Sequence, residues 1–133
     1  MAAYVTDTHA LVWYAGGRYK RLSRTALRLF ELADRERAII YVPAAVVWEV
    51  GLLSRARRIA PVASLALWAE TLFSRPGFEL SPLDPHVLDA AVSLTFTDDL
   101  FDSAITATAL TKKLALITKD ARIAESGLVE IAW

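Results

Sequence analysis

The stretch that decides the fold is YVTDTHALVW at residues 4–13. It overlaps a short apolar segment at residues 2–6, which is typical of a β-strand. Residues 7–14 then favour a helix, and Gly16 and Gly17 provide the glycine signal that commonly ends one. The acidic residue Asp7 therefore stands where a strand gives way to a helix.

The same alternation continues along the chain. Further strands are predicted at residues 38–42, 78–83, 114–118 and 129–132, and helices at residues 23–37, 43–58, 61–75, 85–94, 99–113 and 120–125. Short strands alternating with helices are typical of a parallel sheet that is covered on both faces. We therefore predict an α/β sandwich with a mostly parallel central sheet, in one domain spanning residues 1–133.

The composition excludes several classes of protein. The 133 residues are 55% hydrophobic and 23% charged and include no cysteine. A disordered chain, a disulfide scaffold and a thiolate metal site are therefore excluded. The longest apolar run, residues 38–48, is too short to span a bilayer, which takes about 20 residues. We expect a soluble cytoplasmic protein that does not associate with membranes.

The formal net charge is zero, so no global positive field attracts nucleic acid. The charges are unevenly distributed, since residues 18–58 carry ten Lys or Arg and four Asp or Glu, whereas residues 59–133 carry five and ten. This asymmetry indicates either solvated helix faces or a basic rim beside an acidic pocket. Under the second interpretation the phosphate-binding candidates are Arg18, Lys20, Arg21 and Arg24, with Arg55, Arg57 and Arg58 as a second cluster.

Acidic residues recur at the predicted ends of strands. Asp7 and Asp120 each follow a strand, and Glu49 interrupts an apolar helix that follows another. Asp99 and Asp102 are three residues apart and share a helix face. Each Asp alone could be a helix cap, and Glu49 alone could face solvent. Because active sites of parallel sheets lie at the carboxyl ends of the strands, we expect these acids to converge.

Converging carboxylates repel one another, and a hard divalent cation relieves that repulsion. Mg²⁺ prefers carboxylate oxygens and retained waters, and such a site orients water and stabilises charge on a phosphate during displacement. The sequence has no zinc-ligand spacing, Walker A motif, dinucleotide-binding motif or nucleophile elbow.

Four stretches resemble the motifs of PIN-domain ribonucleases, particularly VapC-type toxins of toxin–antitoxin pairs. They are residues 4–13, Trp48-Glu49-Val50, DLFDSAITATA at residues 99–109, and LITKD at residues 116–120. They occur in the order and at the spacing of that family. The chain departs from the family at Leu100 and Ser103, where Pro and Arg are frequent. A Ser or Thr usual before the Trp-Glu motif is replaced by Pro43-Ala44-Ala45.

The resemblance implies a three-layer PIN-like sandwich and an endoribonuclease that depends on Mg²⁺ or Mn²⁺. It implies that the catalytic and metal-binding quartet is Asp7, Glu49, Asp102 and Asp120, with Asp99 as an additional acid and Thr118 as a polar support. It also implies a homodimer and a cognate VapB-type antitoxin that occupies the active-site groove. In the implied reaction, water attacks the scissile RNA phosphorus in line and leaves a 5′-phosphate and a 3′-hydroxyl.

The sequence leaves one other function open and disfavours two more. A non-catalytic PIN-like module would bind RNA or protein without cutting. A haloacid-dehalogenase-type phosphatase would need a second Asp where His9 stands, and a response-regulator receiver would need an Asp where Pro43 follows Val42. We expect His9 and the tryptophans to serve in packing or at an interface rather than in base stacking.

Overall fold

A four-stranded, all-parallel sheet forms the centre of the computed structural model, which describes residues 1–133. Its strands are β1 (Ala2–Thr6), β2 (Ala38–Pro43), β3 (Phe78–Ser81) and β4 (Ala115–Ile117), in the order β3-β2-β1-β4. The predicted parallel sheet is confirmed. Since every strand runs the same way, all four carboxyl ends lie at one edge.

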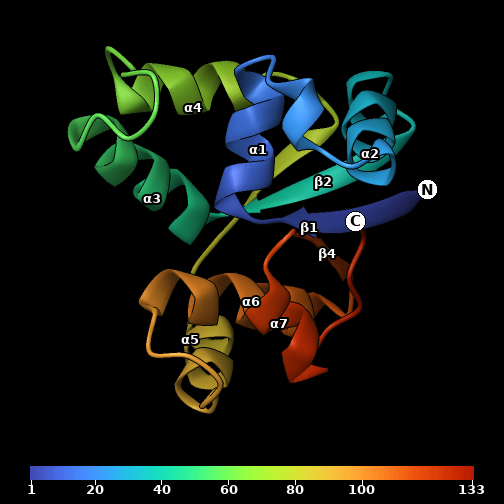
Figure 1. The fold of residues 1–133 in the computed structure, drawn as a ribbon, viewed down its shortest axis with the longest axis vertical. Coiled ribbons are helices and arrows are strands. Elements are labelled where there is room, and N and C mark those ends of the chain that lie inside the picture. The colour runs from blue at the N-terminus through green and yellow to red at the C-terminus, as the bar shows by residue number, and fades with distance from the viewer.

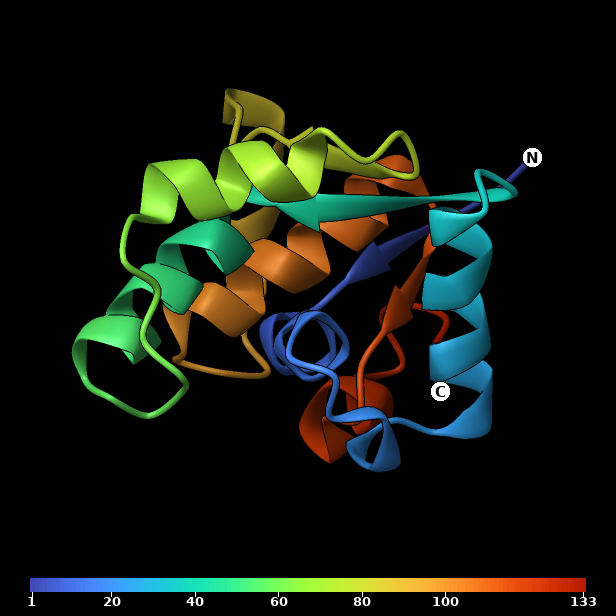
Figure 2. The same cartoon turned by 90° about the horizontal axis from the view of Figure 1, so that it is seen from above.

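Helices cover both faces of this sheet, as predicted (Figure 1). One side carries α1 (Thr8–Ala15), α2 (Arg24–Asp34), α3 (Ala44–Arg55) and α4 (Leu65–Phe73). The other carries α5 (Pro85–Val92), α6 (Leu100–Lys112) and α7 (Ala121–Ser126). The view from above in Figure 2 shows β1 leading directly into α1. No helix is both long and apolar enough to cross a membrane.

Some predicted boundaries were wrong. The helix predicted from residue 61 begins at Leu65, because the Ser64 hydroxyl caps it by accepting from the Leu67 amide at 3.2 Å. β3 stops at Ser81, before Pro82, which has no amide hydrogen to donate. The predicted strand at residues 129–132 makes only one bridge, between Leu116 and Ile131, since its backbone pairs only with the two polar groups of Leu116.

The chain turns sharply after α1. Gly17 adopts a φ of 71°, its amide donates to the Tyr14 carbonyl at 3.1 Å, and the Arg18 amide donates to the Trp13 carbonyl at 2.7 Å. This is a Schellman motif, which favours glycine at the left-handed position. The turn leads into the short 3₁₀ helix η1 (Tyr19–Arg21), which the sequence did not predict. Because the turn reverses the chain, η1 lies against α1.

The core lies between the sheet and the helices on each side. The rings of Tyr14 and Phe30 stack with centroids 4.7 Å apart, and Phe30 stacks on Phe78 at 6.4 Å. On the opposite side of the sheet, Ile105 of α6 and Ile123 of α7 are buried. Burial of large side chains on both faces accounts for the high hydrophobic content of the sequence.

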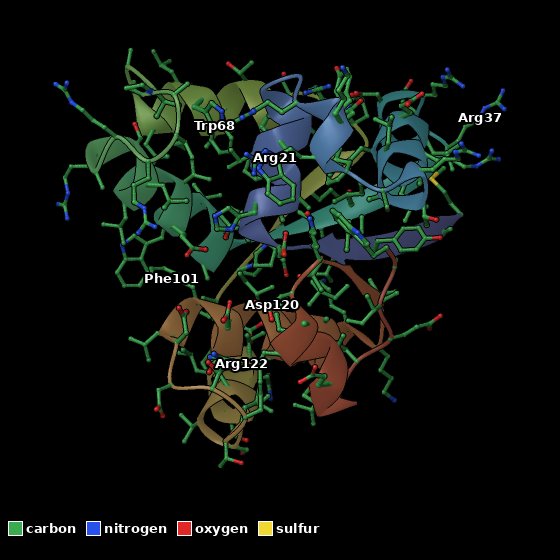
Figure 3. The ribbon with its side chains drawn as sticks, viewed as in Figure 1. Arg21, Arg37, Trp68, Phe101, Asp120 and Arg122 are labelled. Carbon is green, nitrogen blue, oxygen red and sulfur yellow. The ribbon has the colours of Figure 1, made fainter.

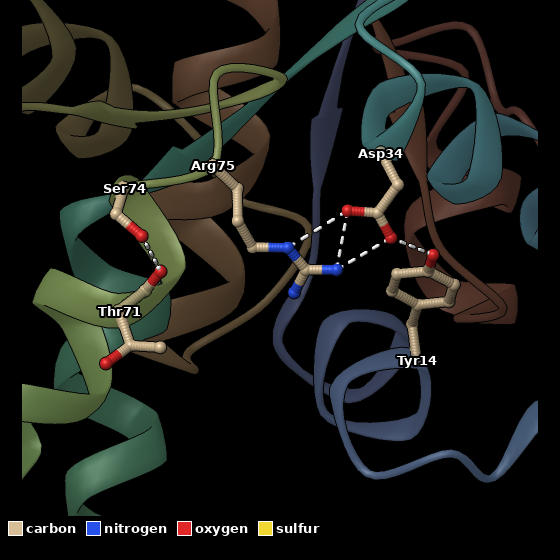
Figure 4. A network of polar contacts seen from close by, with 5 residues as sticks. All are labelled: Tyr14, Asp34, Thr71, Ser74 and Arg75. Carbon is tan, nitrogen blue, oxygen red and sulfur yellow. Dashed lines mark hydrogen bonds and ion pairs between the residues drawn. The ribbon is translucent and has the colours of Figure 1, made fainter.

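A polar network fastens three elements at the edge of this core (Figure 4). The Asp34 carboxylate at the end of α2 accepts hydrogen bonds from the Tyr14 hydroxyl of α1 and from the Arg75 guanidinium, which follows α4. The Arg75 Nε–Asp34 Oδ1 distance is 2.9 Å, and Nη2 lies 2.6 Å from Oδ2. Burial and the Asp34 carboxylate both raise the pKa of Tyr14, so the phenol remains a donor.

Candidate active site

Asp7 occupies the carboxyl end of β1 and caps α1. Its amide donates to the Ile117 carbonyl of β4 at 3.1 Å, which fixes Asp7 between β1 and the neighbouring edge strand. Its Oδ1 accepts from the Ala10 amide at 2.9 Å, and its Oδ2 accepts from the Thr118 hydroxyl. The Asp7 carboxylate is therefore held by one helix N-terminus and one neighbouring strand.

Asp120 stands beside it, at the start of α7. The Thr118 oxygen accepts from the Asp120 amide at 3.0 Å, so one threonine contacts both acidic residues. The Asp120 Oδ1 accepts from the amides of Arg122 and Ile123 at 2.8 and 3.1 Å, which makes Asp120 the cap of α7. Capping leaves the second carboxylate oxygen without a protein hydrogen bond.

Glu49 reaches the same edge from α3. Its side chain is half-buried rather than solvent-facing, and its Oε1 accepts from the hydroxyl of Thr8 in the first turn of α1. The sequence interpretation missed Thr8, although a hydroxyl directly after Asp7 in the Thr-Asp-Thr stretch was the available signal. The neighbouring Trp48 is 57% exposed, and its ring contacts Phe101 edge-on with centroids 5.3 Å apart.

Asp99 and Asp102 approach from the opposite side of the sheet, at the start of α6. Asp99 caps this helix, since its Oδ1 accepts from the amides of Phe101 and Asp102 at 2.8 and 3.0 Å. Asp102 makes no side-chain hydrogen bond to the protein and is half-buried. It is thus the acid in the group that is least constrained by its neighbours.

The electrostatics show that these acids share one region. The pKa of Asp102 is raised to about 6 by burial, which has the largest effect, together with the nearby carboxylates of Asp99, Asp120, Glu49 and Asp7. The pKa of Asp7 is likewise raised to about 6, because the effect of burial outweighs that of the hydrogen bonds from Thr118 and Ala10, which lower it. Holding all these groups ionised without a counter-cation is therefore unfavourable.

The donor set consists of carboxylate and hydroxyl oxygens, which suits Mg²⁺ or Mn²⁺ chemically. No three Asp, Glu or His side chains are arranged in the structure as a complete set of metal ligands. Asp7, Glu49, Asp99 and Asp120 are instead engaged in the local hydrogen bonds described above. Binding a cation would require some of these oxygens to reorient or to act through water.

The predicted basic residues lie beyond α1. Arg18, Lys20 and Arg21 line one surface pocket together with Gly17 and Tyr19, whereas Arg24 opens α2 and is not part of its lining. His9, which was expected to pack, is exposed and lies close enough to lower the pKa of Asp7. Figure 3 shows Arg21 beside α1 and Asp120 below it.

Comparison with known proteins supports the same conclusion about the fold. VapC20 of Mycobacterium tuberculosis, described as a sarcin–ricin loop cleaving toxin, superposes with a TM-score of 0.67 at 17% identity, covering 98% of this chain and 99% of that chain. A chain of DNA-bound VapBC from Salmonella typhimurium superposes with a TM-score of 0.68 at 13% identity, covering 98% of this chain and 97% of that chain. A chain of VapBC2 from Rickettsia felis superposes with a TM-score of 0.64 at 11% identity, covering 97% of this chain and 96% of that chain.

No curated protein sequence matches the chain. The sequence pattern of the PIN domain, in contrast, matches residues 4–127, from β1 to the end of α7. The match includes all the acidic residues described above, and the fold agrees with it. The chain belongs to the PIN domain family.

Proposed function

We propose that this PIN domain is a metal-dependent endoribonuclease, the toxin of a VapBC-type toxin–antitoxin pair. The observation that supports the proposal best is the coupling of five carboxylates at the carboxyl edge of a PIN-type sheet. An isolated helix cap would not explain acids supplied by four separate elements. RNA is proposed as the substrate because VapC20, which shares this fold, is described as a toxin that cleaves the sarcin–ricin loop.

Asp7, Glu49, Asp102 and Asp120 would hold Mg²⁺ or Mn²⁺. The bound cation would lower the pKa of water and neutralise charge on the scissile phosphate. Thr118 orients the Asp7 carboxylate, and Thr8 orients Glu49, so both hydroxyls act through the acids they contact. The Asp99 cap fixes the first turn of α6, which carries Asp102.

Two protein partners belong to this proposal. A VapB-type antitoxin is proposed because solved structures with this fold include VapBC complexes. A homodimer is proposed because large apolar side chains, including Trp48, Val92 and Leu100, are exposed on neighbouring elements. We further propose that the protein acts in the cytoplasm, where RNA is available to it.

Cleavage mapping on total RNA tests the nuclease function. The purified chain should cut RNA with Mg²⁺ or Mn²⁺ and lose activity in EDTA. Asp102→Asn and Glu49→Gln should abolish cleavage, because each would remove a charged ligand of the proposed cation. Asp89→Asn, which changes an exposed acid on α5, is the matched control and should cut at the parental rate.

Two results would contradict the proposal. Cleavage by Asp102→Asn at the parental rate would remove that acid from the site. RNA binding without any cleavage in Mn²⁺ would instead favour the non-catalytic PIN-like module.

A further inference from the structure

Three neighbouring side chains form what we call the α1 strip: His9 and Trp13 of α1, and Arg21 of η1. His9 and Trp13 are one helical turn apart, and their ring centroids are separated by 5.9 Å. The guanidinium carbon of Arg21 lies 5.6 Å from the centre of the Trp13 ring. The strip therefore combines an exposed ring, a half-buried indole and a cation, and Figure 3 shows Arg21 beside α1.

The backbone accounts for this arrangement. The Schellman turn at Gly17 reverses the chain after α1, and η1 then brings Arg21 over the indole. On another side, the Trp133 ring contacts Trp13 in an edge-on geometry, with centroids 6.4 Å apart. The indole is thus held from two directions, so Arg21 rests on a fixed surface.

The Arg21 charge is not neutralised by the protein. The structure contains two ion pairs, Arg35 with Glu31 and Arg75 with Asp34. Arg21 is exposed and belongs to neither. A cation held over an aromatic face, with its donors free, is suited to a phosphate group.

The α1 strip begins at the acidic site. His9 is two residues from Asp7 and close enough to affect its carboxylate. Trp13 is six residues beyond Asp7, about 9 Å along the helix axis. A cluster of carboxylates repels a phosphodiester chain, so a strand crossing it needs positive charge close by, and Arg21 supplies it on this side.

We propose that the α1 strip binds single-stranded RNA on one side of the scissile bond, with Arg21 contacting a backbone phosphate and the His9 ring stacking on a base. The inference rests on the proposed nuclease function and names the surface that would position its substrate. Stacking on a ring tolerates any base, so the strip would contribute affinity and position rather than sequence preference.

Binding without chemistry tests the inference. The probe is a fluorescent single-stranded oligoribonucleotide, titrated in EDTA at several salt concentrations so that cleavage cannot occur. The variants are Arg21→Gln and His9→Ala, both at exposed positions. Arg37→Gln is the matched control, because it removes one exposed arginine far from the α1 strip (Figure 3).

Each variant has a distinct expected result. Arg21→Gln should reduce the slope of log K against log salt by about 0.7, the value for one lost phosphate contact on a single strand. His9→Ala should weaken binding about fivefold or more with an unchanged slope, because it removes stacking but no fixed charge. Arg37→Gln should change neither quantity.

Equal salt slopes for Arg21→Gln, Arg37→Gln and the parent would overturn the inference. A parent protein that does not bind the oligoribonucleotide would also overturn it. The nuclease function is judged separately, by divalent-dependent cleavage in the parent and its loss in Asp102→Asn. If the parent cleaves RNA but Arg21→Gln and His9→Ala bind RNA like the parent, the α1 strip is not an RNA-binding surface and the nuclease proposal stands.

Discussion

At the residue scale, Asp102 stands where its charged form is unfavourable for the stability of the fold. Its carboxylate lies near four other carboxylates, and both partial burial and this repulsion disfavour its charged form. It makes no side-chain hydrogen bond to the protein that would offset the cost. Charge kept at such a position is typical of residues retained for binding or chemistry.

Asp102→Asn should therefore raise the thermal stability of the protein in EDTA at pH 7.5, because the amide is isosteric and uncharged. Under the proposed metal binding, addition of Mg²⁺ should reverse the order, since the cation would bind the parent's full set of carboxylates more tightly than the variant's. Thermal melts with and without Mg²⁺ measure both effects. Asp89→Asn, on the exposed face of α5, should leave the melting temperature nearly unchanged in both buffers.

The same carboxyl groups predict a pH dependence for the metal-free protein. Asp7 and Asp102 have folded pKa values of about 6, against an ordinary value of 3.8. Between these values the folded state binds more protons than the unfolded state, so the free energy of unfolding falls as pH rises from 4 to beyond 6. Urea titrations across this range should show the decline, and it should be smaller in Asp102→Asn. A rise in stability over the same interval would contradict the assignment.

At the scale of elements, the ends of helices carry specific backbone requirements. Gly17 has a φ of 71°, and no heavy atom lies within 4 Å of where a Cβ would be. Gly17→Ala should therefore cost only the backbone penalty, about 1–2 kcal/mol, measured by chemical denaturation.

Lys113 ends α6 with a φ of 56°, a left-handed conformation that glycine adopts more readily than lysine. Lys113→Gly should therefore raise the free energy of unfolding by up to about 1 kcal/mol, measured by the same chemical denaturation.

The network around Asp34 joins α1, α2 and the segment after α4 (Figure 4). Arg75 and Asp34 are partly exposed, so their pairing should contribute about 0.5–1 kcal/mol. Tyr14→Phe removes one hydrogen bond and should cost about 1 kcal/mol. A double-mutant cycle of Tyr14→Phe and Arg75→Gln should show coupling, because both contact the same carboxylate. Strict additivity would show that the shared carboxylate does not link them.

At the scale of the whole molecule, a mainly apolar hollow lies between α3, α5 and α6. It has a volume of about 460 Å³, and Trp48, Leu88, Val92 and Leu100 contribute to its lining. Val92 is 84% exposed and Leu100 is 78% exposed. Because large apolar surfaces on a monomer commonly mark interaction sites, this hollow is the surface that the proposed homodimer would bury.

Leu100→Glu should therefore convert a dimer into a monomer, as measured by light scattering after size-exclusion chromatography. Leu67, which is 63% exposed on α4, offers a matched change outside this hollow. Leu67→Glu should leave the oligomeric state unaltered. A parent that is monomeric at high concentration would contradict the homodimer proposal and leave the nuclease proposal untouched.

The sequence by itself determined the layered α/β fold, because strands and helices differ in the period of their apolar residues. It also located Asp7, Asp99 and Asp120 at helix starts, since caps are set by local hydrogen bonds. The predicted strand at residues 129–132 was wrong, because its apolar pattern cannot show how few backbone groups are available to pair with it.

Only the tertiary structure decided which distant residues meet. The contact of Thr8 with Glu49 joins residues 41 positions apart, and that of Thr118 with Asp7 joins residues 111 apart. Arg21 lies over Trp13 because the chain turns back at Gly17. His9 is exposed because it lies on the side of α1 that does not pack against the sheet. Such contacts depend on the packing of whole elements, which no local pattern of residue types encodes.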